Sequence, residues 1–443
     1  MDLQRMKESI FEAIELNRNE IINIGRTVLM NPEMGYREFK TASLVKGIIS
    51  GLTRDFTDSL AVTGVKAVLR GRSSRFKIAV LGELDAVLCP SHPYADKTTG
   101  AAHACGHNAQ IASMLGTAIG LAKSGIMESL DGDVVFMAVP AEEFVELEYR
   151  QRLKDEGRIS FLGGKQELIR IGAFDDIDMA MMVHCHSDTP GRKVFIYGTS
   201  TGFIGKSICF KGREAHAGGA PHEGLNALNA AMAALMCIHA QRETFRDEDQ
   251  IRVHPIITKG GDLVNIVPAD VRMETYVRGK TLQAVIEANK KVNRAIMGGA
   301  YAIGAEAEIT EIPGYLPLNQ DHTLSTLFEN NIKPLVGKEN ITEGVDLPGS
   351  TDAGDLSSLI PVIHPTMGGF KGPVHSRHFE IADEDAAYIL PAKAMAATIV
   401  DLLENGAGKA ERIKREFSPQ FTKDSYLKMW KQIINTGGNT HVE

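Results

Sequence analysis

Short apolar segments that alternate with helical patterns constrain the fold of this chain more than any other feature. Three of them are nearly continuous: FKIAVLGE (76–83), GDVVFMAVP (132–140) and DIDMAMMVHC (176–185). A helix of small residues is expected at 107–124, between the first two. Apolar runs of this length are typical of strands buried in a parallel sheet, whose two faces are covered by helices. The chain is therefore expected to be an α/β protein with a mostly parallel sheet.

The sequence pattern changes near residue 199. A strand is predicted at 202–212 and a helix at 224–242. Two strands follow, within QIRVHPIIT and DVRMETYVRG, and then a helix at 281–297 and a strand at 305–312. This β-α-β-β-α-β order is typical of a ferredoxin-like α+β unit. A helix at 383–404 then returns to the α/β pattern. We predict an inserted dimerisation or lid domain at 199–313 and a discontinuous catalytic domain made of 1–198 and 314–443.

Composition and charge exclude several classes of protein. The chain has 443 residues, 43% of them hydrophobic and 23% charged, which fits a globular protein of two or three domains. The 48 basic and 56 acidic residues give a net charge of −8, so a nucleic acid or an anionic membrane is not expected as a partner. The N-terminal ~30 residues predict an amphipathic helix and no signal peptide, and no apolar window is long enough for a membrane span.

Cysteine usage predicts a cytoplasmic protein. Secreted scaffolds carry dense, even sets of cysteines that pair as disulfides. This chain has five scattered cysteines: Cys89, Cys105, Cys185, Cys209 and Cys237. We expect reduced thiols in a reducing compartment.

Polar groups gather where the apolar segments end. HACGHN (103–108) comes soon after the first segment, PAEE (140–143) ends the second, HCHSD (184–188) ends the third and GPVHSRH (372–378) follows a later one. Open α/β sheets bind ligands at the carboxyl ends of their strands. We therefore expect carboxylate, imidazole and thiolate groups from four strand ends to meet at one site.

The residue types at these positions favour a metal-dependent hydrolase. In Cys-Gly-His, Cys105 and His107 can face one point, and thiolate with imidazole suits zinc, whereas carboxylates also suit manganese. Each residue alone has an ordinary structural explanation, but their convergence favours a metal centre. Of the adjacent Glu142 and Glu143, one can bind metal while the other takes a proton from water and gives it to a leaving amine. This arrangement predicts amide hydrolysis.

The motifs together resemble a known family. GELDA, HACGHN, PAEE, KGREAHAG, GGDLVNIVP and STDAGD…GPVHSRHF follow one another from about residue 82 to about residue 380. In this order they resemble the co-catalytic metallopeptidase family that contains carboxypeptidase G, aminoacylases and p-aminobenzoyl-glutamate hydrolase. HACGH is similar to the amidohydrolase branch, which includes the aminobenzoyl-glutamate and auxin-conjugate hydrolases.

The resemblance implies a centre of two divalent metal ions, either zinc or manganese. Its ligands would be Cys105 (bridging both ions), His107, Glu143, His184 and His375. Glu142 would be the general base, and Asp85 would orient a ligand. His186 competes with His184 for the ligand position.

The resemblance also implies a role for the inserted domain. His216 in KGREAHAG would cross a homodimer interface to the substrate carbonyl, and Asn265 in NIVP would hydrogen-bond the substrate. Arg278 could receive a substrate carboxylate, although a plain surface arginine is an equal alternative at this position.

Some features depart from the family pattern. Asn108 stands where the amidohydrolase branch commonly has an aspartate. The insertion CPSHPYADKTTG (89–100) is a candidate for the rim of the substrate pocket, and the charged segment 144–163 is a candidate lid. The last ~35 residues predict an appended helix.

The leading hypothesis is a cytoplasmic two-metal amidohydrolase acting on an N-acyl or N-aroyl amino acid, such as a p-aminobenzoyl-glutamate-like conjugate. A dipeptidase or exopeptidase of the same family would share every catalytic residue. An inactive binding or regulatory subunit is an alternative from another class, but it would need a broken site. Every predicted position here holds a competent residue.

Overall fold

The computed structural model describes residues 2–435 and residue 437, and these form two compact units. The first unit comprises Met1–Thr199, Asn319–Asp346 and Asp355–Gln420, and the second comprises Ser200–Leu318, Leu347–Gly354 and Phe421–Glu443, within the described residues. The expected division placed all of 314–443 in the first unit. It differs at 314–318, at 347–354 and in the described residues from Phe421 on, all of which belong to the second unit. In the last of these segments, helix α13 (Lys423–Ile434) packs on strand β14 (Glu306–Pro313).

The first unit is built on a six-stranded mixed sheet. Its order is β1 (Phe56–Leu60), β2 (Gly64–Leu69), β6 (Asp133–Val139), β3 (Lys77–Glu83), β7 (Met179–Met181) and β16 (Val362–Ile363). The strands from β6 to β16 are parallel, whereas β1 and β2 add an antiparallel edge. The apolar runs of the sequence form β3, β6 and β7, and the central strands β3 and β6 are almost fully buried, as expected for a covered parallel sheet.

The third apolar segment is divided between two sheets. After β7 the chain continues into β8 (His184–Cys185), which belongs to a four-stranded sheet with β15 (Ile341–Glu343), β9 (Val194–Ile196) and β17 (Thr366–Met367). Strand β8 pairs in parallel with β17. The break after β7 lets this segment leave the large sheet and carry His184 away from it.

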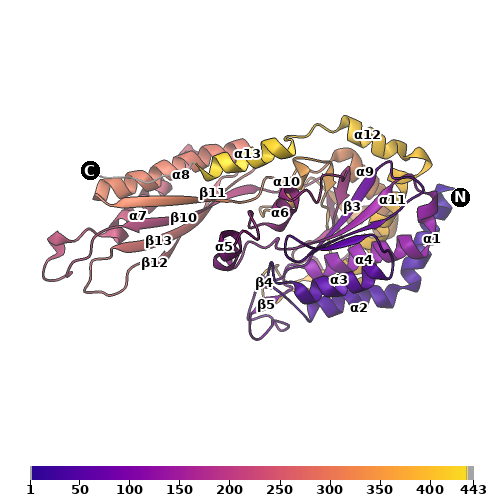
Figure 1. Cartoon of the computed structure of the whole chain (residues 1–443), viewed down its shortest axis with the longest axis horizontal. Helices are drawn as coiled ribbons and strands as arrows, with labels where there is room; N and C mark the ends of the chain where they lie inside the picture. The colour runs from indigo at the N-terminus through magenta and orange to yellow at the C-terminus, as the bar shows by residue number, and fades with distance from the viewer. Residues whose placement is uncertain (1, 436, 438–443) are drawn as a thin grey trace. The chain divides into compact units, whose positions relative to one another are not determined.

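Helices pack on the first sheet around α4 (His107–Lys123), whose residues are buried at nearly every position. It contacts β3, α1 (Leu3–Leu16), α2 (Arg18–Leu29), α3 (Phe39–Ser50) and α11 (Leu390–Leu403) (Figure 1). The expected single N-terminal helix is two helices, because the chain breaks at Asn17. The segment Asp385–Leu403 is long and apolar enough to cross a membrane, but 94% of its apolar window is buried inside the protein, as in a core helix.

The second unit has the order β10 (Gly202–Lys211), α7 (Ala227–Ala240), β11 (Arg252–Val253), β12 (Ile256–Lys259), β13 (Asp270–Gly279), α8 (Leu282–Ile303) and β14. Its antiparallel sheet runs β11-β13-β10-β14, and β12 also pairs with β13. This is the β-α-β-β-α-β arrangement that the sequence predicts. One expected strand is two short ones, because Pro255 cannot donate a hydrogen bond to a neighbouring strand.

The remaining helices and strands are short or lie at the periphery of the units. They are β4 (Val87–Leu88), β5 (Ala101–Ala102), α5 (Leu147–Asp155), α6 (Gly164–Arg170), α9 (His322–Val336), α10 (Ala353–Ser357), β18 (Phe370–Lys371), β19 (Glu380–Ile381) and α12 (Gly408–Glu416).

Candidate active site

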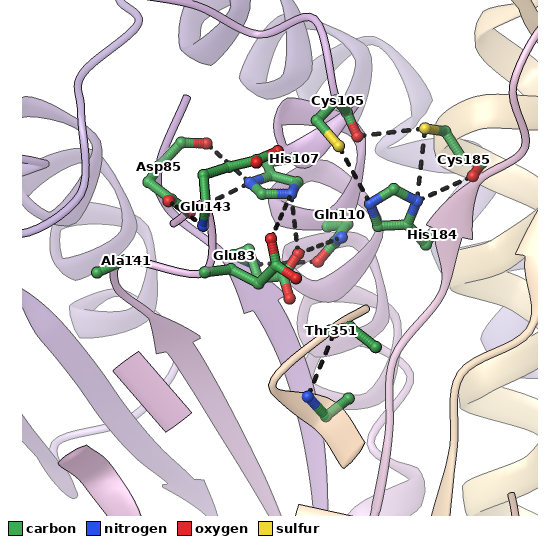
Figure 2. Close-up of polar contacts among 12 residues, drawn as sticks. Glu83, Asp85, Cys105, His107, Gln110, Ala141, Glu143, His184, Cys185 and Thr351 are labelled. Atoms are coloured by element: carbon green, nitrogen blue, oxygen red, sulfur yellow. Dashed lines mark hydrogen bonds and ion pairs between the residues drawn. The ribbon is translucent and has the colours of Figure 1, made fainter. Parts of the chain in front are cut away.

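The strand ends of the first unit bring the predicted groups together (Figure 2). Asp85 follows β3, the glutamates follow β6, and His184 begins β8. The Cys105-Gly106-His107 turn leads into α4 through Gly106, which has φ +74°. A Cβ atom on Gly106 would lie 2.9 Å from the Cys185 side chain, so only glycine fits this turn. The tight turn places a thiol and an imidazole on either side of one residue.

Two sets of potential metal ligands share one residue. Cys105, His107 and His184 form one set, and Cys105, Glu143 and His375 form the other, with the ligand atoms in each set within 4.8 Å of one another. A third group of potential ligands, Glu83, His107 and Glu142, lacks Cys105. The Cys105 Sγ lies 3.6 Å from His184 Nε2 and 3.2 Å from His375 Nε2. His375 Nε2 in turn lies 3.1 Å from Glu143 Oε1. Cys105 therefore occupies the common position that a bridging ligand requires.

Asp85 connects two of these predicted ligands. Nδ1 of His107 lies 2.8 Å from the Asp85 main-chain oxygen and 3.2 Å from Oδ1, and Asp85 Oδ2 accepts a hydrogen bond of 2.9 Å from the Glu143 main-chain N–H (Figure 2). The contact to Nδ1 leaves Nε2 of His107 facing the cluster. Such a carboxylate beside a ligating histidine fixes the orientation of the ring.

Charges in this pocket are strongly coupled. Burial opposes protonation of His107, but the charge of Glu83 and the hydrogen bond to Asp85 outweigh it and raise the pKa of the imidazole. Burial, with the nearby Glu143 charge, raises the pKa of the Cys105 thiol well above its usual value. Burial would also raise the pKa of Glu143, but the hydrogen bond from His375 lowers it below the usual range. The Glu143 carboxyl therefore stays ionised, as a metal ligand requires.

The donor set fits divalent metal ions. Four carboxylates lie buried here, those of Glu83, Asp85, Glu142 and Glu143. Two buried ligand atoms face other groups of the cluster, because His107 Nε2 lies 3.0 Å from Glu83 Oε2 and Glu143 Oε1 lies 3.1 Å from His375 Nε2. So many buried carboxylates are costly unless a cation balances them, and thiolate, imidazole and carboxylate are the ligands that zinc takes.

Three residues without a predicted role lie beside these ligands: Glu83, Lys165 and Gln110. Glu83 ends β3, with Oε2 3.0 Å from His107 Nε2. Its Oε1 accepts a hydrogen bond of 2.5 Å from Lys165 Nζ, and its Oε2 accepts one of 2.7 Å from Gln110. Burial opposes ionisation of Glu83, but the Lys165 and His107 charges lower the pKa of its carboxyl. An acid at the last position of a buried strand is a signal in the sequence, whereas Lys165 gives none.

The two histidines of HCHSD have different surroundings. His184 belongs to the first ligand set, whereas the His186 ring stacks on Phe195 with 3.7 Å between centroids and contacts Thr366 Oγ1 at 3.0 Å. A third histidine, His364, packs against His184 with 5.6 Å between ring centroids. Burial lowers the pKa of His364 to about 3, so this ring is neutral.

The insertion 89–100 lines a cavity of about 470 Å³. Its residues in the wall are His92, Pro93 and Tyr94, and segment 377–380 closes the opposite side. His92 Nε2 lies 2.8 Å from the Phe379 main-chain oxygen, which ties the insertion to the segment that follows His375. The residues that line this cavity include none of the predicted metal ligands, so the rim of a substrate pocket stays a prediction.

His216 and Asn265 lie on neighbouring segments of the second unit. The His216 Nδ1 accepts hydrogen bonds from the N–H groups of Gly218 (3.2 Å) and Gly219 (2.9 Å), so the neutral ring carries its proton on Nε2. The Ala217 N–H donates to the Asn265 main-chain oxygen at 2.9 Å. Both side chains are exposed. His216 can therefore donate a hydrogen bond from Nε2.

Arg278 is not a plain surface arginine. Its guanidinium lies 4.9 Å from the Phe203 ring centroid and 5.3 Å from that of Tyr276, and Nη1 donates to Ser350 Oγ at 2.8 Å. Among the described residues no carboxylate pairs with Arg278. It lines a cavity of about 370 Å³ with Arg252 and other residues. A half-buried guanidinium without an anion is suited to receive one.

The acids that follow β3 and β6 meet imidazoles and a thiol from other segments of the first unit, and such a donor set is typical of metal-dependent hydrolases. Peptidase family M20/M25/M40 matches residues 79–401. The chain belongs to this family.

Named relatives include different hydrolases. The mouse (Mus musculus) Xaa-Arg dipeptidase is 30% identical over 338 residues, which cover 73% of this chain and 72% of the mouse protein. The N-acyl-L-amino acid amidohydrolase of Geobacillus stearothermophilus is 25% identical over 324 residues, covering 70% of this chain and 81% of that protein.

Solved structures share the fold. A dinuclear metal binding peptidase of this family from Bacillus subtilis has a TM-score of 0.67 at 22% identity, covering 88% of this chain and 99% of that one. The aminobenzoyl-glutamate utilization protein of Klebsiella pneumoniae has a TM-score of 0.66 at 18% identity, covering 88% and 98%.

Proposed function

We propose that this hydrolase cleaves the amide bond of an N-acyl or N-aroyl amino acid at a two-metal centre, with zinc or manganese as the ions. The observation that carries the proposal is the position of Cys105, which is common to both ligand sets. His107 and His184 complete one set, and Glu143 and His375 complete the other. When bound, two divalent ions would make a water molecule acidic and polarise the substrate carbonyl.

Glu142 is the proposed general base. It is buried, precedes the ligand Glu143, and its Oε2 lies 3.9 Å from His107 Nε2. A carboxylate there can take a proton from the attacking water and give it to the leaving amine. His216 would donate from Nε2 to the substrate carbonyl oxygen as negative charge develops on it.

Arg278 is the proposed receptor for the substrate carboxylate, so we expect Arg278→Met to raise KM about 10–100-fold, because charge-assisted hydrogen bonds contribute about 1.5–3 kcal/mol. The effect should vanish for the methyl ester of the same substrate. KM is measured with the acid and the ester for wild type, for this variant and for Arg272→Met, an exposed residue of the same strand that serves as control. An equal rise in KM for acid and ester would contradict the assignment.

A homodimer through the second unit is also proposed. Helix α7 buries Ala227, Ala230, Ala231, Ala234 and Ile238 against its own unit, yet Met232 and Met236 are 56% and 72% exposed. Within the part of the chain that the structure describes, strand β12 pairs only with β13, and it exposes Ile256 and Ile257. Exposed apolar residues on a helix face and an edge strand are typical of an interface.

We expect Met236→Asp to convert a two-chain assembly into single chains, because a carboxylate would be buried without a partner. Light scattering after size exclusion measures the mass, and Met30→Asp, at an exposed methionine of the first unit, is the control. A wild type that is strictly monomeric and fully active would contradict both the dimer and the role of His216 across it.

A second candidate function is a dipeptidase, which the 30% identity with the Xaa-Arg dipeptidase favours. Hydrolysis of N-acyl amino acids, p-aminobenzoyl-glutamate and dipeptides, Xaa-Arg peptides included, separates the candidates. Preference for a blocked amine supports the amidohydrolase, and a requirement for a free α-amine supports the dipeptidase.

We also infer a reducing, cytoplasmic setting, because all five cysteines are free.

A further inference from the structure

The charged segment that follows the two glutamates, residues 144–163, contains an arginine buried inside the first unit. Arg150 lies on α5 and has no exposed surface. Among the described residues its guanidinium pairs with no carboxylate, and its hydrogen-bond partners are main-chain carbonyl oxygens. Burying a guanidinium is costly unless its N–H groups are hydrogen-bonded. The groups to which this arginine donates hydrogen bonds therefore indicate its role.

Arg150 contacts the main chain on both sides of Glu142. Its Nη1 donates to the oxygens of Ala141 (3.4 Å) and Leu162 (2.7 Å), and its Nη2 donates to the oxygen of Glu143. We name residues 140–143 the glutamate turn. A planar guanidinium can bond to several carbonyl oxygens at fixed angles, which a lysine ammonium cannot reproduce. Arg150 thus joins the two ends of the peptide segment that carries Glu142.

The glutamate turn needs such support because it is strained. Ala141 has φ +54°, a left-handed conformation that is strained for a residue with a Cβ and persists only where its surroundings enforce it. The Ala141 N–H donates to Glu38 Oε1 at 2.8 Å, and the Glu143 N–H donates to Asp85 Oδ2 at 2.9 Å. Figure 2 shows Ala141 and Glu143 on this turn, beside Asp85. Side chains from three separate segments therefore fix the main chain around Glu142.

The N-terminal part of the chain closes around the same arginine. A Cβ atom on Gly35 would lie 2.3 Å from Arg150 Nη2 and 2.9 Å from the Ala141 Cα, so the main chain there packs directly on both. The guanidinium lies 5.5 Å from the Tyr36 ring centroid, and the Tyr36 hydroxyl donates to the Phe161 oxygen at 3.0 Å. The charged segment is thus anchored to the core near both of its ends.

We propose that Arg150 is a positioning residue that holds the glutamate turn in its reactive geometry. The charged segment then acts as an internal support for that turn and not as a lid. The inference rests on the proposed function, in which Glu142 is the base and Glu143 a metal ligand. Because the hydrogen bonds of Arg150 go to main-chain oxygens, its loss should change the positions of these two carboxylates and leave the carboxylates themselves present.

The test compares Arg150→Lys and Arg150→Met with wild type and with Arg152→Met, a control at an exposed arginine of the same helix. We expect kcat to fall about 10–100-fold in both Arg150 variants with little change in KM, because small displacements of catalytic groups cost this much. Metal affinity, measured by competition with a chelator, should fall about 10–100-fold, as it does when a ligand loses its orienting partner. Arg152→Met should match wild type in all three quantities.

Each outcome decides the inference. Wild type without bound metal and without turnover would defeat the proposed function itself, and the inference with it. An active wild type beside a folded Arg150→Lys variant with kcat and metal affinity within twofold of normal would overturn the positioning role alone. Normal kcat per folded molecule with only a lower melting temperature would also overturn it. If Arg150→Met does not fold, Arg150→Lys, which keeps the charge, decides.

Discussion

Replacement of Glu142 with glutamine is expected to lower kcat by about a thousand-fold, within the range that general acid–base groups contribute, while the metal content stays unchanged. The amide has nearly the same shape as the carboxylate but cannot accept a proton at the relevant pH. Glu142 forms a group of potential ligands with Glu83 and His107 but belongs to neither set around Cys105, so its loss should leave the ligands of those two sets in place. KM should change little, because the missing group acts on water and on the leaving amine.

The measurement combines steady-state kinetics with metal analysis of the same preparation. Glu148→Gln, at an exposed glutamate a few residues away, is the matched control and should behave like wild type. If the Glu142→Gln variant kept more than a tenth of the wild-type kcat, another residue would have to be the general base. Loss of metal together with activity would instead indicate that Glu142 is itself a ligand.

Replacement of Cys105 with alanine is expected to release both metal ions, whereas replacement of a ligand that belongs to one set should weaken mainly one. Cys105 is the member common to both sets, and His184 and His375 each belong to one. We expect the affinity of both metals to fall by more than the roughly 10–100-fold that loss of an orienting partner costs. His184→Ala and His375→Ala should each retain about one ion under the same conditions.

Metal content after dialysis against a weak chelator tests this order. His186→Ala is the control, because His186 stacks on Phe195 and belongs to neither ligand set. If the Cys105→Ala variant retained two ions, Cys105 would not be a bridging ligand. If His186→Ala lost an ion and His184→Ala lost none, His186 would be the metal ligand in place of His184.

Much of the fold follows from local patterns in the sequence. Strand β13 occupies the predicted segment 270–279, and β3 and β6 follow the two apolar runs closely, because burial on both faces requires continuous apolar residues. The break at Asn17 between α1 and α2 was not predicted, since apolar residues recur across it. The attachment of α13 to β14 depends on a contact between distant parts of the chain, which no local pattern specifies.

Compact motifs in the sequence indicate candidate site residues such as Cys105, His107 and Glu143, which lie close together in the structure. The residues around them have no such motif. Lys165 bonds Glu83 from 82 positions away, and Arg150 lies in a segment whose charge is typical of a solvated surface. A buried cation and an exposed one look alike in a sequence, because burial is decided by what the rest of the chain packs around them.

Stepwise addition of zinc or manganese to chelator-treated wild type, with hydrolysis of an N-acyl amino acid followed at each step, tests the central claim most directly. The account predicts no turnover without metal and a rise in activity that levels off at about two ions per chain. Full turnover by the metal-free protein, or saturation of binding without any turnover of acyl amino acids or dipeptides, would contradict it.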